Sequence, residues 1–90
     1  MASPADRGII VIHLVKVKGE LRTAVFKENV NEIAEKLGIR GGVRVVETLG
    51  RVDYVVIYRA SSIEQASNFA TEVRRIEDVV DSETLIGIAI

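Results

Sequence analysis

Apolar residues follow two different spacings along this chain, and the two spacings alternate. Four segments are rich in β-branched residues and predict strands: residues 8–18, 43–47, 52–60 and 79–90. In 21–37 and 62–77 the apolar residues recur every three or four positions opposite charged ones, which is typical of amphipathic helices. The predicted order of elements is therefore βαββαβ.

Turn and capping residues mark the ends of these elements. Gly38 follows the first helical pattern as a C-terminal cap, because glycine adopts the left-handed conformation easily. Ser62 and Gln65 have the spacing of a capping box at the start of the second helix. Gly50 predicts a tight hairpin corner between the second and third strands.

The predicted first strand is apolar on both faces. Its alternate positions are Ile9, Val11, His13, Val15 and Val17 on one side and Ile10, Ile12, Leu14, Lys16 and Lys18 on the other. The βαββαβ order is that of an α+β, ferredoxin-like fold, a four-stranded antiparallel sheet with two helices on one face. Leaving roughly 500 Å² of apolar surface in water on the other face, at about 25 cal/mol per Å², would cost near 12 kcal/mol, comparable to the stability of a domain. We therefore expect a homodimer that forms through the sheet.

Composition limits the classes of function. Ninety residues make one domain, expected at 8–90, with 1–7 as a flexible N-terminal tail. The chain is 48% hydrophobic with a mean hydropathy of +0.23, and its net charge is -1 with no dominant basic face, so we expect no direct nucleic-acid partner. It has no cysteine, which excludes thiolate chemistry and favours a cytoplasmic location. No apolar run approaches the roughly 20 residues that span a bilayer, so no membrane partner is expected.

Few residues suggest chemistry. His13 is the only histidine, and with no carboxylate near it in sequence we expect a structural role, hydrogen-bonded at the dimer interface, and no metal site or cofactor. Glu47 and Asp53 flank the corner, but no nucleophile or histidine accompanies them, so no catalytic residue is predicted. Tyr54 and Tyr58 lie where RNA-recognition domains carry stacking aromatics, yet the flanking basic and aromatic residues of that motif are missing. We expect both tyrosines at the interface, with their hydroxyls at its rim.

The predicted corner carries a resemblance to a known family. The segment Thr48-Leu49-Gly50-Arg51-Val52-Asp53 resembles the Gly-x-x-Asp corner of the effector-binding (RAM) domain of Lrp/AsnC transcription regulators. The closing segment 79–86 is similar to that family's final strand, with a Val-Val pair followed by a threonine. The sequence departs from the family at Val52, where an aromatic is usual, and at Glu77-Asp78, where Pro-Gly is usual.

The resemblance implies a stand-alone module that binds a small, amino-acid-like effector and does not bind DNA by itself. It implies a homodimer, extending to tetramers or octamers, with full-length Lrp/AsnC regulators as further partners. The effector-binding residues carried over are Gly50, Arg51, Val52, Asp53 and Thr84. Asp53 would accept from an effector ammonium group, and the backbone near Gly50 would meet a carboxylate.

Two alternatives stay open. The βαββαβ dimer also resembles small dimeric α/β-barrel proteins of the GYD type and antibiotic-biosynthesis-type monooxygenases, some of which are enzymes. An enzyme would need a polar cluster inside its cavity, and His13 with Tyr54 or Tyr58 is the combination that this sequence offers. The other alternative is a purely structural or interaction role. We expect a binding module and not an enzyme.

Overall fold

The computed structural model describes residues 8–19 and 22–88 and confirms the predicted order of elements. The predicted tail, Leu21 of the first helical pattern and the last two positions of the fourth predicted strand lie outside the described residues. The elements are β1 (Ile9–Val17), α2 (Thr23–Lys36), β2 (Val43–Glu47), β3 (Tyr54–Ala60), α3 (Ile63–Arg74) and β4 (Val79–Ile88).

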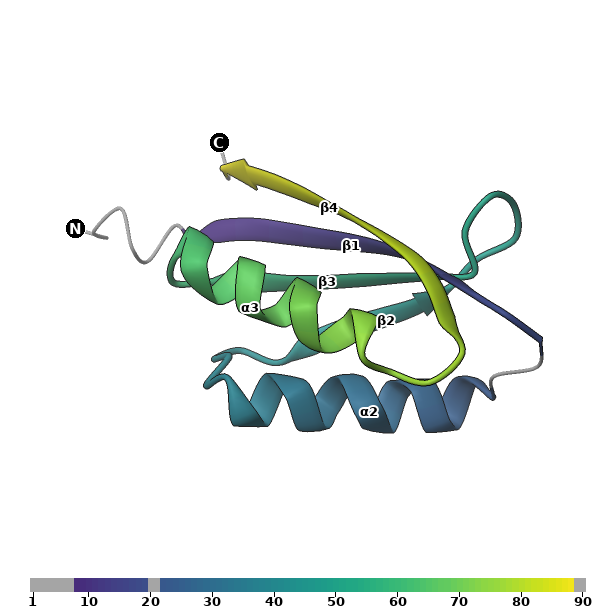
Figure 1. The fold of residues 1–90 in the computed structure, drawn as a ribbon. Helices are drawn as coiled ribbons and strands as arrows, with labels where there is room; N and C mark the ends of the chain where they lie inside the picture. Colours follow the sequence, from purple (N-terminus) through teal and green to yellow (C-terminus); the bar gives the residue numbers. More distant parts are fainter. Residues whose placement is uncertain (1–7, 20–21, 89–90) are drawn as a thin grey trace.

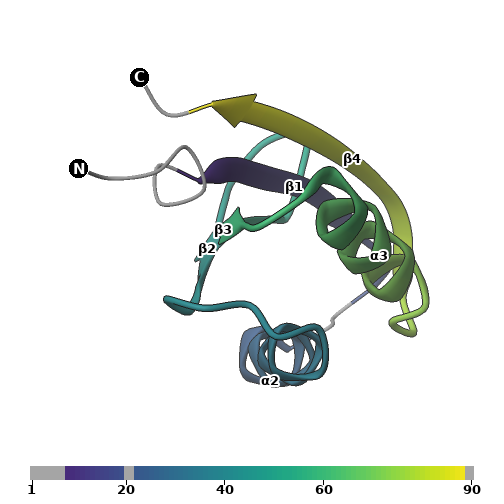
Figure 2. The same ribbon diagram turned by 90° about the vertical axis from the view of Figure 1, so that its left-hand side faces the viewer.

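The four strands form one antiparallel sheet in the order β2-β3-β1-β4. Figure 1 shows both helices on the same side of this sheet, and Figure 2 shows α2 below β2 and α3 beside β1 and β4. The opposite side carries no element of the described chain (Figure 2). The fold is ferredoxin-like, as the sequence predicts.

The core lies between the helices and the sheet. Val11, His13 and Val15 of β1 have no exposed surface, so the odd-numbered face of the first strand is the one that the helices cover. Phe26 from α2 and Phe69 from α3 are also completely buried. The remaining buried apolar residues are Val30, Ile33, Ala34, Tyr54, Val56, Tyr58, Ala60, Ala66, Ala70 and Val73.

The helix ends use the residues that the sequence marks. Gly38, at φ +71°, follows α2; its N–H donates to the Glu35 carbonyl, and the Ile39 N–H donates to the Ala34 carbonyl, which together make a Schellman motif. At the start of α3, the Ser62 hydroxyl accepts from the Gln65 N–H at 3.0 Å. Neither helix has the length and apolar content that crossing a membrane requires, within the described part of the chain.

Candidate functional site

The corner at 48–53 joins β2 to β3 and projects beyond the end of the sheet, away from α2 (Figure 1). The Thr48 N–H donates to the Asp53 carbonyl at 2.9 Å, and the Thr48 hydroxyl donates to the Val52 carbonyl at 2.7 Å. Gly50 has φ +134°, which an L-residue rarely adopts, so the glycine is required by the backbone conformation and not by lack of space. The corner is therefore a closed loop with its own hydrogen bonds.

Asp53 fastens this loop to the end of β1. Its N–H donates to the Val15 carbonyl at 2.9 Å, and its Oδ2 accepts from the Val17 N–H at 2.9 Å. The carboxylate thus takes the place of a backbone acceptor at the point where the ladder between β1 and β3 ends. Its other oxygen, Oδ1, makes no hydrogen bond with the described residues and remains able to accept from a ligand.

The other predicted corner residues differ in their exposure to solvent. Gly50 and Arg51 are exposed, and Val52 is half-buried. Leu49 at the tip is fully exposed, at 102% of its reference area. A leucine that contacts nothing within its own chain gives the tip an apolar surface that is free to meet another molecule.

Thr84 does not join the corner within one chain. It lies on β4 opposite His13, on the helix-covered face, and its hydroxyl is 2.8 Å from His13 Nδ1. Four of the five predicted effector residues are consecutive in the corner, whereas the fifth, Thr84, has its partner in the core.

His13 is the centre of a buried polar network. Its Nε2 is 2.8 Å from the Tyr58 hydroxyl, and its ring stacks on Phe69 with centroids 5.1 Å apart. Burial, with a smaller contribution from the positive charge of Arg74, lowers the pKa of His13 to about 4. The imidazole is therefore neutral at pH 7, so one ring nitrogen accepts a hydrogen bond from one hydroxyl and the protonated ring nitrogen donates a hydrogen bond to the other hydroxyl.

The prediction that His13 and the tyrosines lie at the sheet-to-sheet interface was wrong. All three belong to the helix-covered face, where Tyr54 and Tyr58 are 3% and 4% exposed. The Tyr54 hydroxyl is 3.1 Å from the Thr23 hydroxyl, and burial raises the pKa of Tyr58. Their hydroxyls are satisfied inside the protomer, because helix residues and His13 provide partners there.

The network does not form an accessible reaction site. His13 has no exposed surface, so a substrate cannot reach it in this conformation. The Ser82 hydroxyl on the same face of β4 is buried without a hydrogen-bond partner among the described residues. Within 8–19 and 22–88, no three metal-ligating side chains come together.

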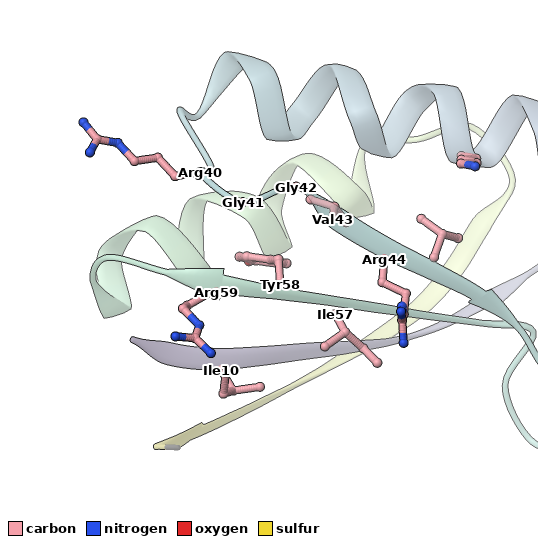
Figure 3. Close-up of a pocket in the computed structure, with 11 residues that line it drawn as sticks. Ile10, Arg40, Gly41, Gly42, Val43, Arg44, Ile57, Tyr58 and Arg59 are labelled. Carbon is pink, nitrogen blue, oxygen red and sulfur yellow. The ribbon is translucent and has the colours of Figure 1, made fainter. Parts of the chain in front are cut away.

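A basic hollow of about 820 Å³ lies at the start of β2 and the end of β3, and its lining comes from both faces of the sheet. Ile10 and Ile57 line it on the uncovered face, and Val43, Val45 and Tyr58 line it on the helix-covered face, together with Lys27 of α2 (Figure 3). Arg44 and Arg59 lie in its wall. The Arg40-Gly41-Gly42 turn borders it, and Arg40 points away from the sheet (Figure 3).

Sequence reasoning missed the His13 network and the basic hollow. Thr84 is 71 positions from His13, and Tyr58 is 45 positions from it, so only strand pairing brings them together. The hollow combines residues from β1, α2, β2 and β3 in the same way. A signal for the network was present in the sequence: a histidine within an apolar strand needs polar partners on the same face.

Comparisons with known proteins identify the fold. The sequence matches no protein-family model, and no curated protein is similar enough to count as a relative. Among solved structures, TTHA0845 from Thermus thermophilus has a TM-score of 0.65 at 20% identity, over 91% of this chain and 95% of that one. A dimeric ferredoxin-like protein of unknown function from Thermobifida fusca YX has a TM-score of 0.54 at 14% identity, over 90% of each chain.

AsnC of E. coli has the same arrangement over part of its length. Its TM-score is 0.59 at 18% identity, and the match covers 96% of this chain and 56% of AsnC. This chain therefore spans little more than half the length of that protein. At these identities the similarity is one of fold: the chain has a ferredoxin-like fold that Lrp/AsnC-type proteins also contain.

Proposed function

We propose that this chain is a self-associating module that binds a small, amino-acid-like molecule, as the effector domain of an Lrp/AsnC regulator does. The observation that carries the proposal is the corner at 48–53. It holds a carboxylate in a fixed position, with one oxygen engaged by Val17 and the other left for a ligand. A charged donor such as an ammonium group forms a stronger hydrogen bond with such an oxygen than a neutral donor does.

The uncovered face of the sheet supports the proposed self-association. Its central positions are the apolar residues Ile10, Ile12, Leu14, Val55 and Ile57, flanked by Val46 and Leu85. Val46 and Leu85 are 37% and 45% exposed, which is unusual for large apolar side chains gathered on one face. A second copy packed on this face removes these side chains from water, and the Thermobifida fusca structure of the same fold is described as dimeric. We propose a homodimer as the basic unit, from which larger assemblies are built.

The corner stands at the end of the sheet that this dimer would use. Its exposed Leu49 and Arg51 provide apolar and cationic contacts beside Asp53. A cation next to a carboxylate matches the two charged ends of an amino acid, because the ligand carboxylate meets Arg51 and its ammonium group meets Asp53. The proposal gives His13 no catalytic role, since its side chain is enclosed in the core.

Isothermal titration calorimetry of the protein against each of the twenty amino acids tests the binding. Asp53→Asn is the informative variant, because an amide oxygen still accepts from the Val17 N–H while the charge is removed. We expect Asp53→Asn to weaken binding about 10- to 100-fold, the value of a hydrogen bond to a charged group. The matched control is Glu47→Gln, which removes one negative charge from the same hairpin at an exposed position.

The two variants separate the proposal from a general charge effect. Equal losses in Asp53→Asn and Glu47→Gln would assign the effect to net charge and not to the Asp53 oxygen. Absence of heat from the parent protein with all twenty amino acids would remove the proposed ligand class.

A further inference from the structure

Basic side chains occupy one corner of the uncovered face. Arg44 of β2 lies opposite Ile57 of β3, and Arg59 of β3 lies opposite Ile10 of β1. Residues paired in this way share a face of the sheet, so both arginines point to the uncovered side, as Figure 3 shows. Arg44 is exposed and makes no ion pair with the described residues.

Acidic side chains occupy the diagonally opposite corner. Glu83 of β4 lies opposite Leu14, and Asp81 lies opposite Lys16. Lys16 offsets the charge of Asp81 across the strands, whereas Glu83 is exposed and makes no ion pair with the described residues. With strands about 4.8 Å apart and a rise of about 3.4 Å per residue, the backbone positions of Arg44 and Glu83 are about 16 Å apart across the face.

An apolar band separates the two charged corners. It consists of Ile10, Ile12, Leu14, Val46, Val55, Ile57 and Leu85. The face therefore has a positive end, an apolar middle and a negative end. Such a face is complementary to itself when one copy is turned so that opposite ends meet.

We propose that two copies of this chain pack face to face with their strands nearly perpendicular, so that Glu83 of each copy meets Arg44 and Arg59 of the other. This inference rests on the proposed self-association and adds its orientation. In a symmetric dimer the two-fold axis lies in the plane between the sheets. A two-fold axis perpendicular to the line that joins the basic and acidic corners brings opposite charges together. This axis runs at about 45° to the strands. The strands of the two copies therefore cross at about 90°, which is an orthogonal packing of the sheets.

Other directions of the two-fold axis leave charged side chains unpaired or close to like charges. An axis parallel to the strands sets Arg44 against Leu85 of the second copy. An axis across the strands brings the two Arg44 side chains close together. Unpaired or like charges buried in an interface are strongly unfavourable, so the diagonal axis is the arrangement that the charges select.

The shape of the face supports the same orientation. The hollow opens in part at the basic corner, where Ile10 and Ile57 lie beside Arg44 and Arg59 on the uncovered face (Figure 3). Leu85 lies two positions after Glu83 on the same face of β4 and is 45% exposed. The diagonal rotation places Leu85 of one copy against Ile10 of the other and Glu83 over the two arginines. The acidic corner of each copy thus covers the part of the other copy's hollow that opens on the uncovered face.

Charge reversal on each side provides the test, since both side chains are exposed in the protomer and their replacement need not disturb its fold. We expect Arg44→Glu and Glu83→Arg each to weaken the homodimer at least about 10-fold, because each variant creates two like-charge contacts. Arg22→Glu is the matched control, since it makes the same change of charge on an exposed side chain at the start of α2, which covers the opposite face of the sheet. Sedimentation equilibrium measures the dissociation constants, and far-UV circular dichroism confirms that each variant is folded.

The decisive step is to mix the two single variants. In the mixed dimer, the carboxylate introduced by Arg44→Glu in one chain would meet the guanidinium introduced by Glu83→Arg in the other. The other contact would join the native Glu83 of the first chain to the native Arg44 of the second chain. Opposite charges would therefore meet at both contacts of the mixed dimer. We expect the mixed dimer, measured by native mass spectrometry, to form in at least about 10-fold preference over either homodimer.

The outcomes of this experiment separate the orientation from self-association. A parent that dimerises while the mixture shows no such preference would overturn this orientation but leave self-association standing. A parent that stays monomeric would overturn self-association itself.

Discussion

Acid should destabilise this protein through His13 in a way that can be calculated. The pKa of His13 falls from 6.5 to about 4 in the folded protein because the ring is buried and Arg74 lies near it. The unfolded chain therefore binds a proton at a higher pH than the folded chain does. The stability that comes from the neutral ring is complete above pH 6.5 and is lost as the pH falls toward 4.

The size of this effect follows from the shift of the pKa. One pKa unit corresponds to about 1.4 kcal/mol, so the free energy of unfolding should fall by about 2.5 kcal/mol between pH 7.5 and 4.5 and by about 3 kcal/mol at lower pH. This loss is a large fraction of the roughly 5–15 kcal/mol that typically stabilises a domain.

Urea unfolding at pH 7.5, 6.5, 5.5 and 4.5, followed by circular dichroism at one protein concentration, measures this effect. His13→Gln serves as the control, because glutamine can hydrogen-bond to the Tyr58 and Thr84 hydroxyls without titrating. The variant is expected to be less stable at pH 7.5 but to lose less stability with acid. Parallel curves for the parent and His13→Gln down to pH 4.5 would refute the reasoning.

Three further substitutions test the local structure by thermal or urea unfolding. Ser62→Ala removes the N-cap of α3 and should cost about 1 kcal/mol, whereas an unchanged melting temperature would deny the cap any role. Asp78 has φ +76°, so Asp78→Gly should stabilise the protein by about 0.5 kcal/mol, and a loss of stability would show that its side chain is needed. Asp53→Ala leaves the Val17 N–H without its acceptor and should lower the free energy of unfolding by about 1–2 kcal/mol. Asp53→Asn should lower it much less, because the amide oxygen still accepts from the Val17 N–H. Equal losses of stability in the two variants would contradict the hydrogen bond.

Much of the fold follows from local patterns. The spacing of apolar residues predicts each helix and strand, and β2 begins and ends at the predicted residues, Val43 and Glu47. Gly38 and Ser62 cap the helices as expected because capping depends on neighbours within four positions. Asp78 takes a positive φ at one of the positions where the sequence departs from the Pro-Gly of the family that it resembles, and the local sequence does not predict this conformation.

The faces of the sheet could not be assigned from the sequence. Both faces of the first strand are apolar, so alternation alone does not say which one the helices cover. His13, Tyr54 and Tyr58 were predicted at an interface because they are amphipathic, but partners far away in sequence satisfy them in the core.

The corner was predicted as a turn, and its fastening to β1 was not. The hydrogen bond from the Val17 N–H to Asp53 links residues 36 positions apart, so the local sequence does not predict it. The structure therefore gives Asp53 a second role beside the one that the resemblance implies. A carboxylate that is held in place by the backbone is also better positioned to bind a ligand.

Sedimentation velocity of the parent protein across micromolar concentrations tests the central claim most directly, because the proposed packing of the uncovered apolar face requires a second copy. We predict a species of twice 9.9 kDa that dissociates only on dilution. A species of 9.9 kDa throughout this range would contradict the claim.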